Sequence, residues 1–141
     1  MKKRILYLLI SIVCFQLLSC SEDDNLPLVD SAVLISSDAY DSALSDNYAI
    51  RSVSVDGDFL TIRFSASGCN GESWKVKLID SGAVAESLPP QRYLVLSLEN
   101  KELCEALITK ELTFDISSLR VDGNSVWLNL KNFEEGILYE Y

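Results

Sequence analysis

The sequence predicts an all-β protein, an antiparallel immunoglobulin-like β-sandwich of about seven strands in one domain over residues 31–141. Three observations favour this class. From residue 48 onward, short runs alternate apolar and polar residues, as half-buried strands do. Clusters of Gly, Pro, Asn and Asp separate these runs. The length of 141 residues fits a single domain, in which two amphipathic sheets bury their apolar faces against each other.

The first two long strands are predicted to form a hairpin. Residues 48–55 and 59–66 alternate in polarity on either side of Asp56-Gly57-Asp58. An Asp-Gly turn between alternating runs is the strongest short-range hairpin signal, because glycine adopts positive φ without strain.

Further strands are predicted over residues 74–79, 93–98, 112–117, 126–131 and 137–141. Two other stretches are less regular. Residues 102–109 fit either one helical turn or a strand, and we prefer a strand. Residues 31–47 are rich in Ser, Asp and Ala, and we expect an edge strand over 32–35 followed by a loop.

The N-terminus has the features of an export signal. Lys2, Lys3 and Arg4 precede an uncharged, mostly apolar run over residues 5–18, which is too short to span a bilayer comfortably. The run ends in a Leu-Leu-Ser-Cys string that resembles a bacterial lipobox, with Cys20 as the acylated residue. We therefore expect residues 1–19 to be a lipoprotein signal peptide and several acyl chains, palmitate among them, to anchor the mature protein. The alternative is that Cys20 is incidental, near an ordinary signal-peptidase site.

Residues 20–30 are predicted to be a lipidated acidic tether. Ser21 is followed by Glu22, Asp23 and Asp24, a string that resembles the export signal of Bacteroidetes lipoproteins. This resemblance implies an outer-membrane protein that faces the cell exterior. The same residues also suit a simple solvated spacer, since like charges repel one another and extend a chain. The two interpretations are compatible.

Composition excludes several kinds of chemistry. The chain contains no His, so neither a His-dependent catalytic triad nor a His-ligated zinc site is possible. The formal net charge of −9 argues against nucleic acid as a partner, because phosphate binding depends on Lys and Arg. Two Asp-Gly-Asp/Asn turns lack the length of a calcium-binding loop, and we expect neither a metal nor any other cofactor.

Two cysteines remain for the domain once the signal is removed and Cys20 is acylated. Cys69 and Cys104 belong to an exported protein, in which thiols tend to oxidise, so we predict a single disulfide. A pair of buried free thiols is the alternative. A redox role is disfavoured because the cysteines have no Cys-x-x-Cys spacing.

Three strings in the sequence resemble a family of small uncharacterised Bacteroidetes lipoproteins. They are Gly-Cys-Asn-Gly-Glu-Ser-Trp at 68–74, Ser-Leu-Glu-Asn-Lys-Glu-Leu-Cys at 97–104, and Phe-Asp-Ile-Ser-Ser-Leu at 114–119. The resemblance covers roughly residues 1–25 and 65–141. It implies an envelope location and a β-rich domain but no activity. It also supports the pairing of Cys69 with Cys104, since both lie within these strings.

The sequence favours a non-catalytic binding or interaction module at the bacterial cell surface, with an envelope protein or a glycan as partner. Trp127 is the candidate binding residue, because it alternates out of phase with the apolar residues of its own run and is expected on the exposed face. One alternative is a small surface-displayed enzyme inhibitor acting through an exposed loop such as residues 67–73. Another is a glycan-active enzyme that uses a pair of the many carboxylates.

Overall fold

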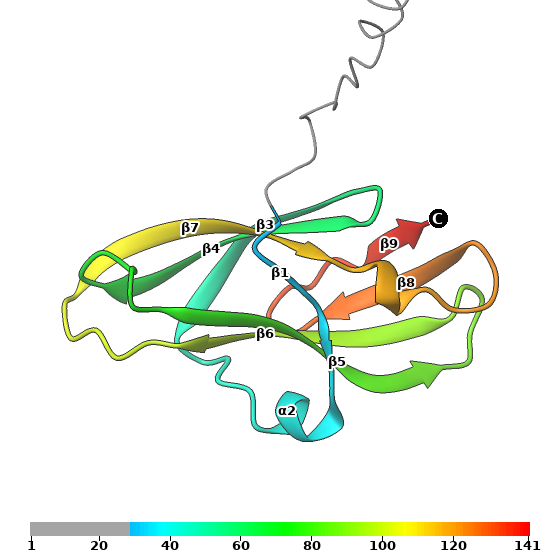
Figure 1. Cartoon of the computed structure of the whole chain (residues 1–141), viewed down its shortest axis with the longest axis horizontal. Coiled ribbons are helices and arrows are strands. Elements are labelled where there is room, and N and C mark those ends of the chain that lie inside the picture. The colour runs from blue at the N-terminus through cyan, green and yellow to red at the C-terminus, as the bar shows by residue number, and fades with distance from the viewer. Residues whose placement is uncertain (1–28) are drawn as a thin grey trace, which may run out of the picture.

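The computed structural model describes residues 29–141, whose long strands form two sheets packed face to face (Figure 1). One sheet has the order β1 (Ser31–Ala32), β7 (Ala106–Asp115), β4 (Phe59–Gly68), β3 (Tyr48–Asp56). The other has the order β2 (Leu34–Ile35), β5 (Lys75–Ala85), β6 (Gln91–Glu99), β8 (Ser125–Leu130), β9 (Ile137–Glu140). A short helix, α2 (Ser37–Asp41), and a 3₁₀ turn, η1 (Ser117–Leu119), complete the described elements. The predicted signal peptide and most of the tether lie outside the described residues.

The sandwich-like, all-β class is confirmed, but both sheets are mixed rather than purely antiparallel. The β1–β7, β2–β5 and β6–β8 pairs are parallel. The first described segment crosses from one sheet to the other at the buried Val33, and each half runs parallel to its neighbour. Alternation of residues along a strand predicts which face is buried, but it contains no information about the direction of the neighbouring strand. The antiparallel part of the prediction therefore needed this correction.

The core lies between the two sheets and follows the predicted alternation. Ile62 and Phe64 of β4 and Leu94 and Leu96 of β6 are fully buried in it. The predicted hairpin is confirmed, since β3 pairs with β4 up to the Asp56–Phe59 pair around a two-residue turn. Strand β4 lies between β3 and β7 and pairs with both of them in antiparallel orientation.

Strand β7 joins two stretches that the sequence separated. The strand preferred over 102–109 and the strand predicted over 112–117 are one element, which begins only at Ala106. Residues 100–105 before it form a loop. Pairing with β4 over the full length of β7 explains this continuity, because β4 provides a partner for every residue from Ala106 to Asp115.

The N-terminal stretch also contains a helix where the sequence predicted a loop. The predicted edge strand is divided into β1 and β2, and α2 follows after the cap residue Ser36. The Ser36 hydroxyl accepts a hydrogen bond from the Ala39 main-chain nitrogen at 3.3 Å, which satisfies one of the free donors of the first turn. Among residues 29–141, no helix has the length and apolar character needed to cross a membrane.

Candidate binding site

Two loops meet at one end of the sandwich, at the left of Figure 1, and we call them the end loops. Residues 69–74 connect β4 to β5, and residues 100–105 connect β6 to β7. A disulfide joins Cys69 to Cys104, with their Cα atoms 4.8 Å apart. The structure thus confirms the predicted disulfide, which crosslinks the two end loops directly.

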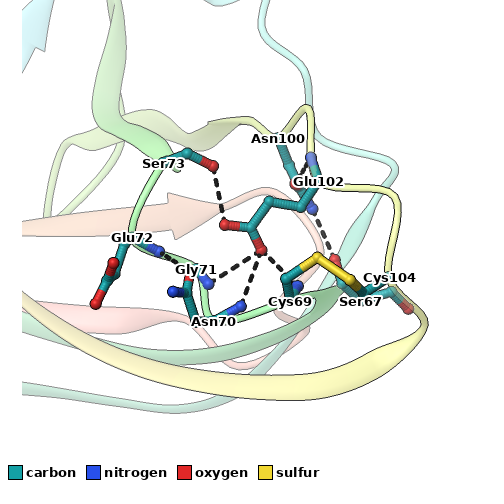
Figure 2. Close-up of a disulfide and its surroundings, with 9 residues drawn as sticks. All are labelled: Ser67, Cys69, Asn70, Gly71, Glu72, Ser73, Asn100, Glu102 and Cys104. Atoms are coloured by element: carbon teal, nitrogen blue, oxygen red, sulfur yellow. Dashed lines mark hydrogen bonds between the residues drawn. A yellow bond between two sulfur atoms is a disulfide. The ribbon is translucent and has the colours of Figure 1, made fainter.

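A carboxylate forms a second link between the end loops (Figure 2). Glu102 Oε2 accepts hydrogen bonds from the main-chain nitrogens of Cys69, Asn70 and Gly71 at 2.6, 3.2 and 3.0 Å. Its Oε1 accepts a hydrogen bond from the Ser73 hydroxyl at 2.9 Å. Successive N–H groups converging on one point are a common anion-binding arrangement. Here the anion is the protein's own side chain.

These contacts determine the charge state of Glu102. Partial desolvation raises the pKa of its carboxyl, but hydrogen bonds from Gly71, Ser73, Cys69 and Asn70 outweigh this effect and lower the pKa from 4.5 to about 2. Glu102 is therefore ionised at neutral pH. A carboxylate that already accepts four hydrogen bonds acts as a structural anion and not as a general acid.

The glycines of the 68–74 string allow the loop to pack onto Trp74. A Cβ atom on Gly68 would lie 2.6 Å from Glu102 Oε2 and 2.8 Å from Trp74 Cζ2. Gly71 has φ of +73°, and a Cβ there would lie 2.8 Å from Lys110 Cε. The Lys110 ammonium donates a hydrogen bond to the Gly71 carbonyl and lies 5.5 Å from the centre of the Trp74 ring. Trp74 is buried and forms the base of this loop.

Leu103 projects from the second end loop. Its side chain is 96% exposed. Glu102 on one side is held by the contacts described above, and Cys104 on the other is held by the disulfide. The loop is anchored further by Asn100, whose side chain donates to the Ser67 carbonyl at 2.7 Å and accepts from the Glu102 main-chain nitrogen at 2.9 Å. An apolar side chain is thus displayed between two restrained residues.

A groove adjoins the base of the same loop. It has a volume of about 350 Å³ and is lined by Ala43, Leu44, Ser45, Asp46, Asn47, Glu99, Asn100 and Lys101. Residues 43–47 form one wall of the groove. They cover the edge of β6 past Leu94, the last residue of β6 that pairs with β8. There the Leu44 carbonyl accepts a hydrogen bond from the Leu98 main-chain nitrogen at 2.9 Å, and the Asn47 side chain donates to the Leu98 carbonyl at 3.3 Å. The groove therefore lies beside the end loops on a closed sheet edge.

The opposite end of the sandwich carries a polar cluster with a structural role. Asp58 in the β3–β4 turn accepts hydrogen bonds from Arg120 at 2.6 and 2.7 Å and from the Tyr139 hydroxyl. The hydrogen bonds from Tyr139 and Arg120 lower the pKa of Asp58. Because these residues come from the β3–β4 turn, the connection before β8, and β9, the cluster ties both sheets together.

A buried ion pair lies within the five-stranded sheet. Asp80 of β5 and Arg92 of β6 form a contact of 2.8 Å, and both residues are buried. Asp80 also accepts a hydrogen bond from the Gly82 main-chain nitrogen at 2.7 Å, close to the irregularity in β5. Burial raises the pKa of Asp80. The pair is enclosed, which favours a role in stabilising the sheet over one in substrate chemistry.

Trp127 lies away from the end loops. It is on β8 beside Gln91, at the start of β6, whereas the end loop follows the other terminus of β6. Its phase was predicted correctly, since Val126 and Leu128 on either side are fully buried. Trp127 itself is half-buried, and its ring covers Gly136, where a Cβ atom would lie 3.1 Å from Trp127 Cε3. The predicted lipidation residue, Cys20, lies outside the described residues.

Sequence reasoning did not identify Glu102 or Leu103 as site residues. It placed Cys69 and Cys104 together and predicted an exposed loop over 67–73, although residues 67 and 68 belong to β4 and Gly71 is buried. The carboxylate contact joins residues 33 positions apart in the chain. The only local signal was the presence of an acidic residue two positions before Cys104, and any acidic sequence contains many such residues.

Comparisons with known proteins support the fold. No family model matches the sequence, and neither does any curated protein. A crystal structure of a DUF1344 protein of unknown function from Bacteroides vulgatus is similar, with a TM-score of 0.53 and 18% sequence identity. The match covers 82% of this chain but only 58% of that one. It shows a shared fold, and its source agrees with the predicted resemblance to uncharacterised Bacteroidetes proteins.

Proposed function

We propose that this protein is a non-catalytic, lipid-anchored binding module of the outer membrane that engages a protein partner through its end loops. The observation that carries the proposal is the 96% exposure of Leu103 between two restrained neighbours. An isolated exposed leucine is common on protein surfaces. Leu103 differs from such a residue because the end loops that display it are held by the Cys69–Cys104 disulfide, by the Glu102 carboxylate and by packing on the buried Trp74. The loop is therefore ordered before a partner binds.

Pre-organisation lowers the cost of binding. A flexible loop loses conformational entropy when it is immobilised by a partner, at about 0.5–1.5 kcal/mol for each mobile side chain. Cys104 and Glu102 are restrained before any partner arrives. Full burial of a leucine side chain contributes about 1.5–3 kcal/mol. More of that free energy is therefore available to stabilise a complex.

The surroundings of Leu103 indicate the chemistry of the partner. Glu72 and Glu105 are exposed on the two end loops, and Leu107 is 66% exposed at the start of β7. Lys101, the cation nearest to Leu103 in the sequence, lies 2.7 Å from Glu99, which offsets its charge. The surface is thus apolar at its centre and acidic at its margin. It suits a partner with an apolar pocket and a basic rim.

The anchor in this proposal rests on the sequence around Cys20. Acylation there, followed by the acidic residues 22–24, would leave the domain tethered outside the outer membrane. We expect the Cys20→Ala variant to leave the membrane fraction or to accumulate with its signal peptide uncleaved. Firm membrane association of a correctly cleaved Cys20→Ala protein would contradict the anchor.

The binding function can be tested by crosslinking on intact cells that display the full-length protein. The Leu103→Ala variant should lose the crosslinked partner that the natural protein captures. Leu88→Ala is the matched control, because Leu88 is 98% exposed in the loop between β5 and β6 at the other end of the sandwich. Equal capture by the natural protein and by Leu103→Ala would exclude the end loops as the binding surface.

A further inference from the structure

We propose that the partner is an endopeptidase with an apolar specificity pocket, and that the loop of residues 100–105 inhibits it by occupying its active site like a substrate. This inference rests on the proposed function and specifies its partner. Leu103 is the residue that would enter the pocket. A binding module without catalytic chemistry of its own can act in this way through shape alone.

Leu103 is displayed at the surface of the second end loop. Proteases recognise an extended segment in which one side chain enters a specificity pocket, and a hydrophobic slot accepts an apolar side chain. Leu103 is 96% exposed, whereas Glu102 is restrained by its hydrogen bonds and Cys104 by the disulfide. The side chain therefore does not have to leave any packing within the described domain in order to enter a pocket.

The main chain around Leu103 lies outside the two sheets. Residues 101–105 form no regular secondary structure. Within residues 29–141, neither the main-chain nitrogen nor the carbonyl oxygen of Leu103 takes part in a hydrogen bond. Both groups are therefore available to pair with a strand of another protein, as in peptide recognition by addition of a strand.

The disulfide and the Glu102 contacts would make such a loop inhibit a protease instead of being consumed by it. The nucleophile of the protease would attack the Leu103 carbonyl carbon, and the bond to the Cys104 nitrogen would break as that nitrogen takes the proton of the nucleophile. The released amine cannot diffuse away, because the disulfide holds Cys104 to Cys69. Glu102 holds the acyl side through its own contacts with the other end loop.

The amine therefore remains next to the acyl carbon at a high effective concentration. It re-attacks, the peptide bond forms again, and the proton returns to the nucleophile, so that no bond is changed overall. Re-formation of the Leu103–Cys104 peptide bond competes with hydrolysis of the acyl-enzyme by water only because the Leu103 acyl group and the Cys104 amine both stay in place. The disulfide and the Glu102 contacts supply this condition.

The test uses full-length, non-reduced protein in detergent with chymotrypsin, subtilisin and elastase, each assayed on a chromogenic peptide. We expect inhibition of at least one of them with a constant below about 1 μM, in the range of specific protein complexes. For chymotrypsin and subtilisin, Leu103→Ala should weaken inhibition by at least about 30-fold, the effect of removing a binding hot spot; elastase, whose pocket is small, should be affected less. Leu88→Ala should inhibit as the natural protein does.

A change of specificity makes the test sharper. Leu103→Arg should abolish inhibition of the three enzymes and create inhibition of trypsin, whose pocket carries an aspartate. If none of the three enzymes is inhibited by the natural protein, or if the loop is cleaved rapidly after Leu103 without inhibition, the inference is wrong. Leu103-dependent capture on cells together with either result would leave the proposed binding function intact. If the protein shows neither protease inhibition nor Leu103-dependent capture, both the inhibitor proposal and the proposed binding function are wrong.

Discussion

The Glu102 carboxylate lies 2.6 Å from the main-chain nitrogen of Cys69, and it connects the two end loops independently of the disulfide. The two links have different chemistry. One is covalent and depends on oxidation, whereas the other is electrostatic and depends on the ionisation of a carboxyl. The order of the end loops can therefore be tested by two separate perturbations.

Acidification should loosen the end loops through Glu102. Because folding lowers the pKa of its carboxyl from 4.5 to about 2, the stabilisation is fully present above the unfolded value and is lost as the pH falls through the folded value. We expect the main-chain amides of residues 69–71 to lose protection from hydrogen exchange between about pH 4.5 and 2. Asp58, whose pKa is also lowered, contributes to global stability in the acid range.

The Glu102→Gln variant separates the two carboxyls. It should expose the amides of residues 69–71 already at pH 7, and the protection that remains should vary little between about pH 4.5 and 2, where the natural protein loses it. The amides around Asp58 should behave as in the natural protein. Unchanged protection of residues 69–71 in Glu102→Gln would show that the carboxylate does not order the loop.

Loss of the disulfide should destabilise the whole domain. Cys69 and Cys104 are 35 positions apart, and closing a loop of this length contributes on the order of 3 to 4 kcal/mol in the chain-entropy model. The double variant Cys69→Ala, Cys104→Ala should show this decrease in the free energy of unfolding, measured by urea denaturation. Fully reduced natural protein should match the double variant, and a stability equal to that of the oxidised protein would contradict the prediction.

The space at Gly68 should be intolerant of a methyl group. In Gly68→Ala the new Cβ would meet Glu102 and the Trp74 ring, and we expect a loss of about 1–3 kcal/mol, the usual cost of overpacking. Urea denaturation gives the stability, and Trp fluorescence reports displacement of the ring. Gly57→Asn is the control, because Gly57 has φ of +54°, a Cβ atom there would meet nothing within 4 Å, and Asn tolerates that conformation. Equal losses in both variants would exclude the contact as the cause.

Trp127 should behave as a half-buried residue of the outer sheet face. In a Trp74→Phe background, which isolates its emission, we expect partial quenching by acrylamide and a further increase in quenching in Gly136→Ala, whose methyl group displaces the ring. Trp127→Ala should cost about 1–2 kcal/mol of folding free energy, less than removal of a fully buried aromatic. Emission that is inaccessible to acrylamide would contradict this placement.

A role for Trp127 in binding stays a prediction. If Trp127 is an anchor for a glycan or a protein, Trp127→Ala should weaken that interaction by about 2 kcal/mol without loss of the fold. The same crosslinking experiment that tests Leu103 compares the two residues directly. Capture that depends on Leu103 and not on Trp127 would place the binding surface at the end loops alone.

The sequence by itself determined which face of each long strand is buried. The period of two along β4 and β8 puts Phe64 and Leu128 in the core and Trp127 on the outer face, because side chains of a strand point alternately to its two sides. The Asp-Gly turn predicted the β3–β4 hairpin for an equally local reason. The predicted export signal and the two domain cysteines were sufficient to predict the disulfide.

Only the tertiary structure decided which strands are neighbours and in which direction they run. The parallel pairing of β6 with β8 depends on a connection that crosses between the sheets, and no local pattern specifies it. The same holds for the site. Glu102 finds its four hydrogen-bond donors 29 to 33 positions away, and Leu103 is exposed between Glu102 and the disulfide-bonded Cys104. Contacts at such separations arise only when the sheets have packed and brought both end loops to one end of the sandwich.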